Sequence, residues 1–109
     1  NNNQNSDNQS NLSDYSPLKT YITNPNFKLG CAISANGFLT NNTIFNLCTE
    51  NFTEIVADND MKYSSCVKNN GSMDFSTVKK FVEKAKQNGI GIYGHTLCWH
   101  SQQNINYLK

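Results

Sequence analysis

The chain has 109 residues, a net charge of +1 at pH 7 and 16% charged side chains. This near-neutral balance argues against nucleic acid or an anionic membrane surface as a partner, because both favour strongly basic proteins. No apolar run reaches the roughly 20 residues that a membrane-spanning helix requires. No signal peptide opens the sequence, so if the protein is exported we expect that its signal has been removed.

The first part of the sequence is polar and of low complexity, with many Asn and Ser residues. It has too few apolar side chains to offset the entropy that is lost on ordering. We therefore predict a disordered polar linker or tether over residues 1–15, with a frayed terminus that has no role as the alternative. Residues 16–109 are predicted to form the folded part.

Helical and strand patterns alternate from Ser16 onward. Residues 17–22 are predicted to form a short helix and residues 27–33 the first strand, followed by a loop at Asn36-Gly37. Apolar side chains then recur at helical spacing over residues 41–51. The next apolar run, Ile55-Val56-Ala57, is typical of a strand that is buried on both faces.

A long loop is predicted over residues 63–73, before a second helical pattern. That pattern is capped by Asp74 or Ser76, ends at Asn88-Gly89 and places its lysines on a solvent-facing side. Its apolar residues are Phe75, Val78, Phe81, Val82 and Ala85, and its lysines are Lys79, Lys80, Lys84 and Lys86. Residues 90–94 complete the pattern as a third strand. The alternation predicts an α/β fold with a parallel sheet and right-handed crossovers.

The densest group of polar and aromatic side chains follows the third predicted strand. The run from Gly94 to Gln103 holds two His, one Trp and two Gln. A Trp ring offers a flat apolar face, while His and Gln offer donors and acceptors, which suits a polar, ring-shaped ligand. Enzymes with parallel strands place their sites at the carboxyl ends of those strands. The run therefore predicts a ligand site.

Three segments resemble motifs of the family 10 glycoside hydrolases, the xylanase (β/α)8 barrels. Residues 94–103 resemble the third-strand signature, residues 52–62 the second-strand motif Phe…Glu-Asn-x-Met-Lys, and residues 26–32 the first strand. The resemblance covers roughly residues 17–109 and implies the N-terminal portion of a TIM barrel, with three strands and two helices. A full barrel needs about 250 residues. We therefore expect residues 16–109 to form the N-terminal third of the barrel, completed by a separate chain or a missing segment.

The resemblance also implies a sugar-binding surface after the second strand. Asn59 and Lys62 match positions that hold a xylose unit on the glycone side. Asp58 stands where the family usually has Glu, and its side chain is one methylene shorter. The alternative for Asp58 is a helix or turn cap, which Asp favours.

After the third strand, the resemblance implies that His95 donates to or accepts from a hydroxyl of the sugar that is cleaved. Trp99 is expected to form an apolar wall for the pyranose ring, and Gln102 to orient the neighbouring unit. His100 is expected to act from behind these residues by orienting the acidic groups.

Catalysis by a retaining glycosidase needs two carboxyl groups about 5–5.5 Å apart. The resemblance implies that both are Glu on the fourth and seventh strands, which lie beyond this sequence. Glu50 and Glu54 are expected around the end of the first long helix and Glu83 on the second, and we assign none of them to catalysis. We therefore expect no catalytic residue in the chain and no activity from the chain alone.

Four Cys are present, and none forms a C-x-x-C pair, which argues against a zinc ribbon or a thioredoxin-like site. We expect Cys31, Cys48, Cys66 and Cys98 mainly as small buried apolar side chains. His95, Cys98 and His100 lack a fourth ligand for a tetrahedral metal site. No metal or cofactor is therefore expected.

Two functional hypotheses follow. The first is that the chain is part of a retaining endo-β-1,4-xylanase, which hydrolyses xylan once the barrel is complete. The remaining strands come from a second polypeptide, or they follow a carbohydrate-binding module that is inserted after this chain. The second is a non-catalytic carbohydrate-binding fragment, although such modules are mostly β-sandwiches. A nucleotide site is a distant third, since Gly89-x-Gly91-x-x-Gly94 lies within a strand instead of opening a helix. A polymeric substrate implies a secreted, cell-surface or periplasmic protein, tethered through residues 1–15.

Overall fold

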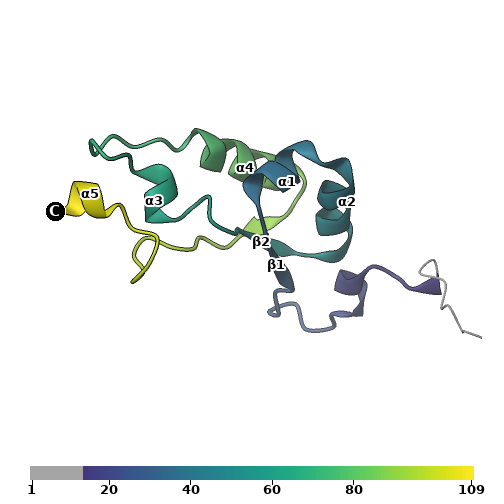
Figure 1. The fold of residues 1–109 in the computed structure, drawn as a ribbon. Coiled ribbons are helices and arrows are strands. Elements are labelled where there is room, and N and C mark those ends of the chain that lie inside the picture. Colours follow the sequence, from purple (N-terminus) through teal and green to yellow (C-terminus); the bar gives the residue numbers. More distant parts are fainter. Residues whose placement is uncertain (1–13) are drawn as a thin grey trace, which may run out of the picture.

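The computed structural model describes residues 14–109, in which helices alternate with parallel strands (Figure 1). The linker predicted over residues 1–15 lies outside the described residues, apart from Asp14 and Tyr15. The elements follow one another in the order η2 (Leu18–Tyr21), β1 (Gly30–Ile33), α1 (Ala35–Thr40), α2 (Asn42–Asn51), β2 (Glu54–Ala57), α3 (Tyr63–Cys66), α4 (Ser76–Gln87), β3 (Gly91–Ile92) and α5 (Ile105–Leu108).

The three strands form one sheet in the order β1-β2-β3, and both pairs of neighbours are parallel. Gly30 lies opposite Glu54 in the first pair, and Glu54 lies opposite Gly91 in the second. A Cβ atom at Gly30 would lie 2.9 Å from the backbone oxygen of Glu54, so this close approach requires glycine. The parallel sheet predicted from the alternation is confirmed.

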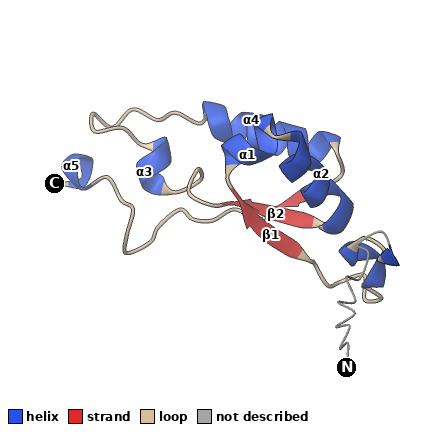
Figure 2. Cartoon of the chain, turned by 45° about the vertical axis from the view of Figure 1, so that its right-hand side comes forward, coloured by secondary structure: helices blue, strands red, loops and turns tan. Residues whose placement is uncertain are grey.

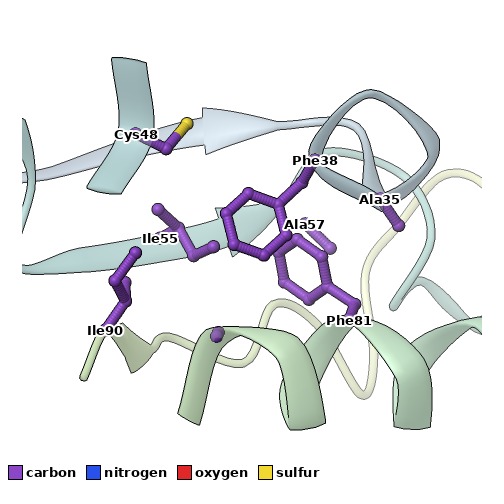
Figure 3. Close-up of a cluster of buried hydrophobic side chains, with 8 residues drawn as sticks. Ala35, Phe38, Cys48, Ile55, Ala57, Phe81 and Ile90 are labelled. Atoms are coloured by element: carbon purple, nitrogen blue, oxygen red, sulfur yellow. The ribbon is translucent and has the colours of Figure 1, made fainter. Parts of the chain in front are cut away.

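Helices α1, α2 and α4 cover one face of the sheet (Figure 2). At the centre of this packing the rings of Phe38 and Phe81 meet edge to face, with centroids 5.3 Å apart. Figure 3 shows the buried cluster, which consists of Ala35, Phe38, Cys48, Ile55, Ala57, Phe81, Ala85 and Ile90. This core fixes the sheet against the helices and thereby fixes the positions of the strand ends.

The opposite face of the sheet carries no helix among residues 14–109 (Figure 2). Ala32 and Tyr93 are exposed on it, and they line a shallow hollow of about 230 Å³ together with Val56. Ile55 and Ala57 are buried, whereas Val56 is only half-buried, so β2 is buried on one face and not on both as expected. In a closed barrel this second face points into the interior, which side chains fill.

Helix α1 lies where a loop was predicted at Asn36-Gly37. Its first turn is stabilised at two points: the Ser34 hydroxyl oxygen accepts from the Gly37 N–H at 3.1 Å, and Asp60 Oδ2 accepts from the Ala35 N–H at 2.9 Å. Ser is a favoured N-cap residue, and this local signal was missed. Asp60 is 25 residues away in the sequence, so its contribution has no local signal.

The helix predicted over residues 41–51 is α2, which begins one residue later because Asn41 caps it: its Oδ1 accepts from the Ile44 N–H at 3.1 Å. Strands β1 and β3 are shorter than the segments predicted over residues 27–33 and 90–94. Both lie at the edges of the three-stranded sheet, where only one neighbour supplies ladder hydrogen bonds.

The second long helix is α4, as the apolar spacing predicted. Asp74 Oδ1 accepts from the N–H of Ser76 at 3.0 Å and so stabilises its first turn, while Phe75 occupies the N-cap position. Gly89 ends the helix with a φ of +69°, the left-handed conformation expected there. The loop predicted over residues 63–73 contains one helical turn, α3.

One lysine of α4 does not belong to the solvent-facing side. Lys79, Lys80 and Lys86 are exposed as predicted, but the Lys84 Nζ donates to the backbone oxygens of Phe38 at 3.0 Å and of Leu39 at 3.1 Å. The prediction was wrong for Lys84 because its ammonium group meets the last carbonyls of α1, where a cation is favoured.

The cysteines differ in their surroundings. Cys48 and Cys66 are buried, which confirms the prediction for them. Cys31 is half-buried, and Cys98 is exposed in the loop after β3, where the prediction was wrong. None of the helices within residues 14–109 is long and apolar enough to cross a membrane.

Candidate functional site

The carboxyl ends of the parallel strands gather the predicted site residues at one edge of the sheet. Asp58 follows β2 directly, and its N–H donates to the Ile33 oxygen of β1 at 3.1 Å. The Tyr93 N–H donates to the Ile55 oxygen at 2.9 Å and so fixes the start of the loop after β3. The backbone hydrogen bonds alone therefore place the segments that follow β2 and β3 next to each other.

Three side chains form a closed hydrogen-bond network across these two segments. Asn59 Oδ1 accepts from Lys62 Nζ and from Gln102 Nε2, each at 2.8 Å. Lys62 Nζ also donates to Gln102 Oε1 at 2.6 Å. The ammonium donor strengthens the two bonds of Lys62, and the amide bond between Gln102 and Asn59 closes the ring, so each of the three residues holds the other two in place. The structure thus brings together Asn59 and Lys62 with a residue 40 or more positions further along the chain.

Asp58 and Trp99 flank this network. Asp58 Oδ2 accepts from Asn59 Nδ2 at 3.2 Å. Lys62 Nζ lies 4.9 Å from the centroid of the Trp99 ring, a distance that allows a cation–π interaction. Trp99 is 36% exposed, which leaves part of its ring accessible to a ligand.

The predicted capping role of Asp58 belongs to another carboxylate of the same segment. Asp60 Oδ2 accepts from the Ala35 N–H at the start of α1, whereas the Asp58 carboxylate accepts from the Asn59 side chain. Asp58 also lines an open hollow of about 270 Å³. The Asp58 carboxylate therefore lies at the carboxyl end of β2 and is accessible from this hollow.

His95 faces the same hollow from the loop after β3. The hollow is lined by His95, Asp58, Lys62 and Tyr93, together with small residues of β1 and β2. His95 also lines a second, more apolar hollow of about 380 Å³ between this loop and α4. His95 is thus the residue that lines both the hollow at the predicted sugar surface and the more apolar hollow next to α4.

His100 lies beside Trp99, with ring centroids 4.7 Å apart and the planes tilted by 66°. It is exposed, and its ring contacts that of Trp99. The Gln103 side-chain amide donates to the backbone oxygen of Trp99, a contact within the same segment. The structure therefore places His100 against the Trp99 ring, and its predicted role in orienting the acidic groups stays a prediction.

The loop after β3 is fastened to α3 by residues that the sequence did not single out. The Ser64 N–H donates to the Gln102 oxygen at 3.0 Å. Asn104 is the buried polar residue of the described chain, and its Nδ2 donates to the Val67 oxygen at 2.9 Å. Asn before an apolar helical start is an N-cap signal that could have indicated Asn104.

The three Glu residues lie away from this edge of the sheet. Glu54 opens β2, at the end opposite to Asp58, and not at the end of a helix as expected. Glu50 lies on α2 and Glu83 on α4, on the helical layer. Within residues 14–109, no group of three or more His, Cys, Asp or Glu side chains is placed to hold a metal ion.

Known proteins share extended sequence similarity with this chain. The model of the family described as glycosyl hydrolase family 10 matches residues 17–109. Endo-1,4-beta-xylanase A of Thermotoga maritima is 39% identical over 87 residues, which are 76% of this chain and 8% of that protein. Endo-beta-1,4-xylanase Xyn10C of Cellvibrio japonicus is 30% identical over 89 residues, which are 76% of this chain and 15% of that protein.

Solved structures that resemble this chain belong to the same family as these relatives. A mutant of xylanase 10C from Cellvibrio japonicus in complex with xylopentaose superposes with a TM-score of 0.74 at 28% identity, over 82% of this chain and 18% of that one. The family 10 structure from Paenibacillus barcinonensis gives 0.66 at 34% identity, over 71% and 22%. The chain spans less than a third of each of these proteins. It belongs to glycosyl hydrolase family 10, and its parallel strands and covering helices are an N-terminal portion of that family's (β/α)8 barrel.

Proposed function

We propose that the chain is part of a retaining endo-β-1,4-xylanase and that it supplies residues that bind the glycone side of xylan. The observation that carries this proposal is the closed network of Asn59, Lys62 and Gln102, which lies beside an exposed Trp ring. A flat ring next to fixed donors and acceptors matches a pyranose, which has an apolar face and a rim of hydroxyls.

Each residue of this surface has a role that its chemistry allows. The Asp58 carboxylate accepts from sugar hydroxyls, and Lys62 donates to one from a group that is already oriented. Trp99 packs against a pyranose face. His95, in the hollow beside Asp58, reaches a hydroxyl of the sugar at the cleavage point, and His100 supports the Trp99 ring.

The catalytic pair is proposed to lie on the rest of the barrel. Retention needs two carboxyl groups about 5–5.5 Å apart. The Glu residues of this chain lie at the far end of β2 or on the helical layer, so they cannot supply that pair at the hollow. The chain alone is therefore inactive in this proposal, and two Glu of the remaining strands act as nucleophile and acid/base.

The partner that completes the barrel is a second polypeptide or a further segment, with an inserted carbohydrate-binding module as an additional neighbour. The open face of the sheet supports this, because parallel sheets are normally covered on both faces. Because xylan is a polymer, we also propose that the protein works outside the cytoplasm, as a secreted, cell-surface or periplasmic enzyme. Residues 1–15 serve as its linker.

A native mass and a denaturing mass of the purified material, followed by an assay on xylan, test the proposal. We expect a species heavier than 12.3 kDa that releases sugars with retained anomeric configuration, while the isolated chain releases none. An assembled barrel without xylan hydrolysis would contradict the xylanase assignment, and hydrolysis by the isolated chain would contradict its inactivity.

The second candidate is a non-catalytic carbohydrate-binding fragment. It is favoured by the network, which is already formed within this chain. In that case the isolated chain would be retained on insoluble xylan, and the Trp99→Ala variant would not be. The assembled material would release no sugar.

A further inference from the structure

Two thiols meet between the sheet and the helical layer, away from the candidate sugar site. Cys31 lies in β1 and Cys48 in α2, and their Sγ atoms are 3.9 Å apart. Cys48 is 1% exposed and Cys31 is half-buried. Figure 3 shows Cys48 directed from its helix toward the sheet. This is the one pair among the four cysteines, all within the described residues, whose sulfur atoms are in contact.

We propose that Cys31 and Cys48 are an oxidative modification site, at which a disulfide ties β1 to α2 when the chain folds in an oxidising compartment. The proposal does not depend on the activity toward xylan. The remaining thiols are separated from this pair: Cys66 donates to the Asp60 oxygen at 3.4 Å, and Cys98 is exposed in the loop after β3.

The two sulfur atoms are already in contact across the strand and the helix. A disulfide needs the sulfur atoms about 2 Å apart. From their contact at 3.9 Å, the two sulfur atoms must therefore move about 2 Å closer to each other. The strand and the helix that carry them are already packed together by the same core. The residues are 17 positions apart in the sequence, so the bond would close a loop that contains all of α1.

The oxidation balances with a small-molecule disulfide such as oxidised glutathione. The Cys31 sulfur, which is the more accessible, loses its proton and attacks one glutathione sulfur, which releases the other half as a thiol. The Cys48 sulfur then loses its proton and attacks the Cys31 sulfur of the mixed disulfide, which releases the second glutathione thiol. Two protein thiols are oxidised to one disulfide, and one glutathione disulfide is reduced to two thiols that take up both protons.

The folded chain itself is a slow substrate for this step. Burial, and next the neighbouring Cys48, raise the pKa of the Cys31 thiol to about 11, so little thiolate is present at neutral pH. The thiolate is the attacking species. The bond therefore forms as the chain folds, before the two thiols are enclosed, and afterwards the same burial shields it from reductants.

The test refolds the purified chain in a buffer of oxidised and reduced glutathione and quenches it with acid. The denatured product is alkylated with iodoacetamide and mapped by peptide mass. We expect a peptide pair linked through Cys31 and Cys48, with loss of alkylation at both, and recovery of both after dithiothreitol. The oxidised chain should also unfold at a higher temperature than the reduced chain, because the bond constrains the unfolded state.

Matched variants separate this bond from random oxidation. The double variant Cys66→Ser/Cys98→Ser should keep the linked peptide, and Cys31→Ser should restore full alkylation of Cys48. Because the covalent map needs no folded variant, it can also be made on the natural protein isolated without reductant. Alkylation of Cys31 and Cys48 as complete as that of Cys98 would overturn the proposal, and so would their pairing with Cys66 or Cys98.

Discussion

At the scale of single residues, Lys62 links the largest number of groups in the candidate site. Its ammonium group donates to Asn59 Oδ1 and Gln102 Oε1 and lies over the Trp99 ring. An ammonium has three donors, and these two bonds use two of them. Lys62 therefore combines an internal role, holding the network, with a remaining capacity to bind a hydroxyl.

Trp99 gives the first prediction. In the assembled enzyme, Trp99→Ala should weaken substrate use by about 1–3 kcal/mol because the apolar wall for the sugar is lost. This corresponds to a fall in kcat/KM on xylan of about 5- to 150-fold. The matched control is Tyr15→Ala, which removes another exposed ring, 62% accessible, far along the chain from the site. An unchanged kcat/KM for Trp99→Ala would remove Trp99 from the binding surface.

Asp58 gives the second prediction. Asp58→Glu extends the carboxylate by one methylene into the hollow that Asp58 lines with His95 and Lys62. We expect a changed affinity for the glycone side and a changed distribution of product lengths, with little change in stability, since an exposed substitution usually alters stability by less than about 0.5 kcal/mol. Product chromatography after xylan digestion measures the effect. If the product pattern stays the same while the unfolding midpoint moves, Asp58 has a structural role.

At the scale of elements, Lys84 connects two helices. It donates to the carbonyls of Phe38 and Leu39 near the end of α1, and its Nζ lies 4.2 Å from the centroid of the Phe45 ring on α2. A cation is favoured at a helix C-terminus, where carbonyls lack partners within the helix. The α4 helix therefore holds α1 and α2 by a polar contact as well as through the apolar core.

Replacing this lysine should lower stability. Lys84→Met keeps most of the apolar stem and removes the ammonium, so we expect a loss of about 1–2 kcal/mol in the free energy of unfolding. Lys80→Met on the exposed side of α4 is the control and should change it by less than about 0.5 kcal/mol. Urea unfolding of both variants, compared by their midpoints at equal slope, gives the answer. Equal midpoints would mean that the Lys84 ammonium group contributes no more to stability than that of Lys80.

The elements differ in how far local sequence determines them. The apolar spacing of α4 and its stop at Gly89 were predictable, since both signals lie within the helix. Helix α1 was predictable only in part: its Ser34 cap is a local signal, but the second stabilising contact of its first turn comes from Asp60, 25 residues away. The site shows the same limit. The motifs pointed to Asn59 and Gln102 separately, but their hydrogen bond spans 43 positions and depends on the fold.

At the scale of the whole molecule, the two faces of the sheet have opposite character. The helices cover one face, and the other exposes Ala32 and Tyr93. The edge strands β1 and β3 also lack one neighbour each within residues 14–109. An open parallel edge and an uncovered face are features that full barrels close. The proposed remainder of the barrel would cover both at once.

This asymmetry gives the last prediction. Ala32→Lys places a charge on the open face, where the alanine is exposed, so the isolated chain should tolerate it. In the closed barrel the same charge would be enclosed without a partner, which costs several kcal/mol and should prevent assembly with the remaining strands. Thr77→Lys, at an exposed position of α4 on the covered side, is the control and should assemble normally. Native mass and xylan hydrolysis of both variants decide the matter, because normal assembly of Ala32→Lys would show that this face is not the barrel interior.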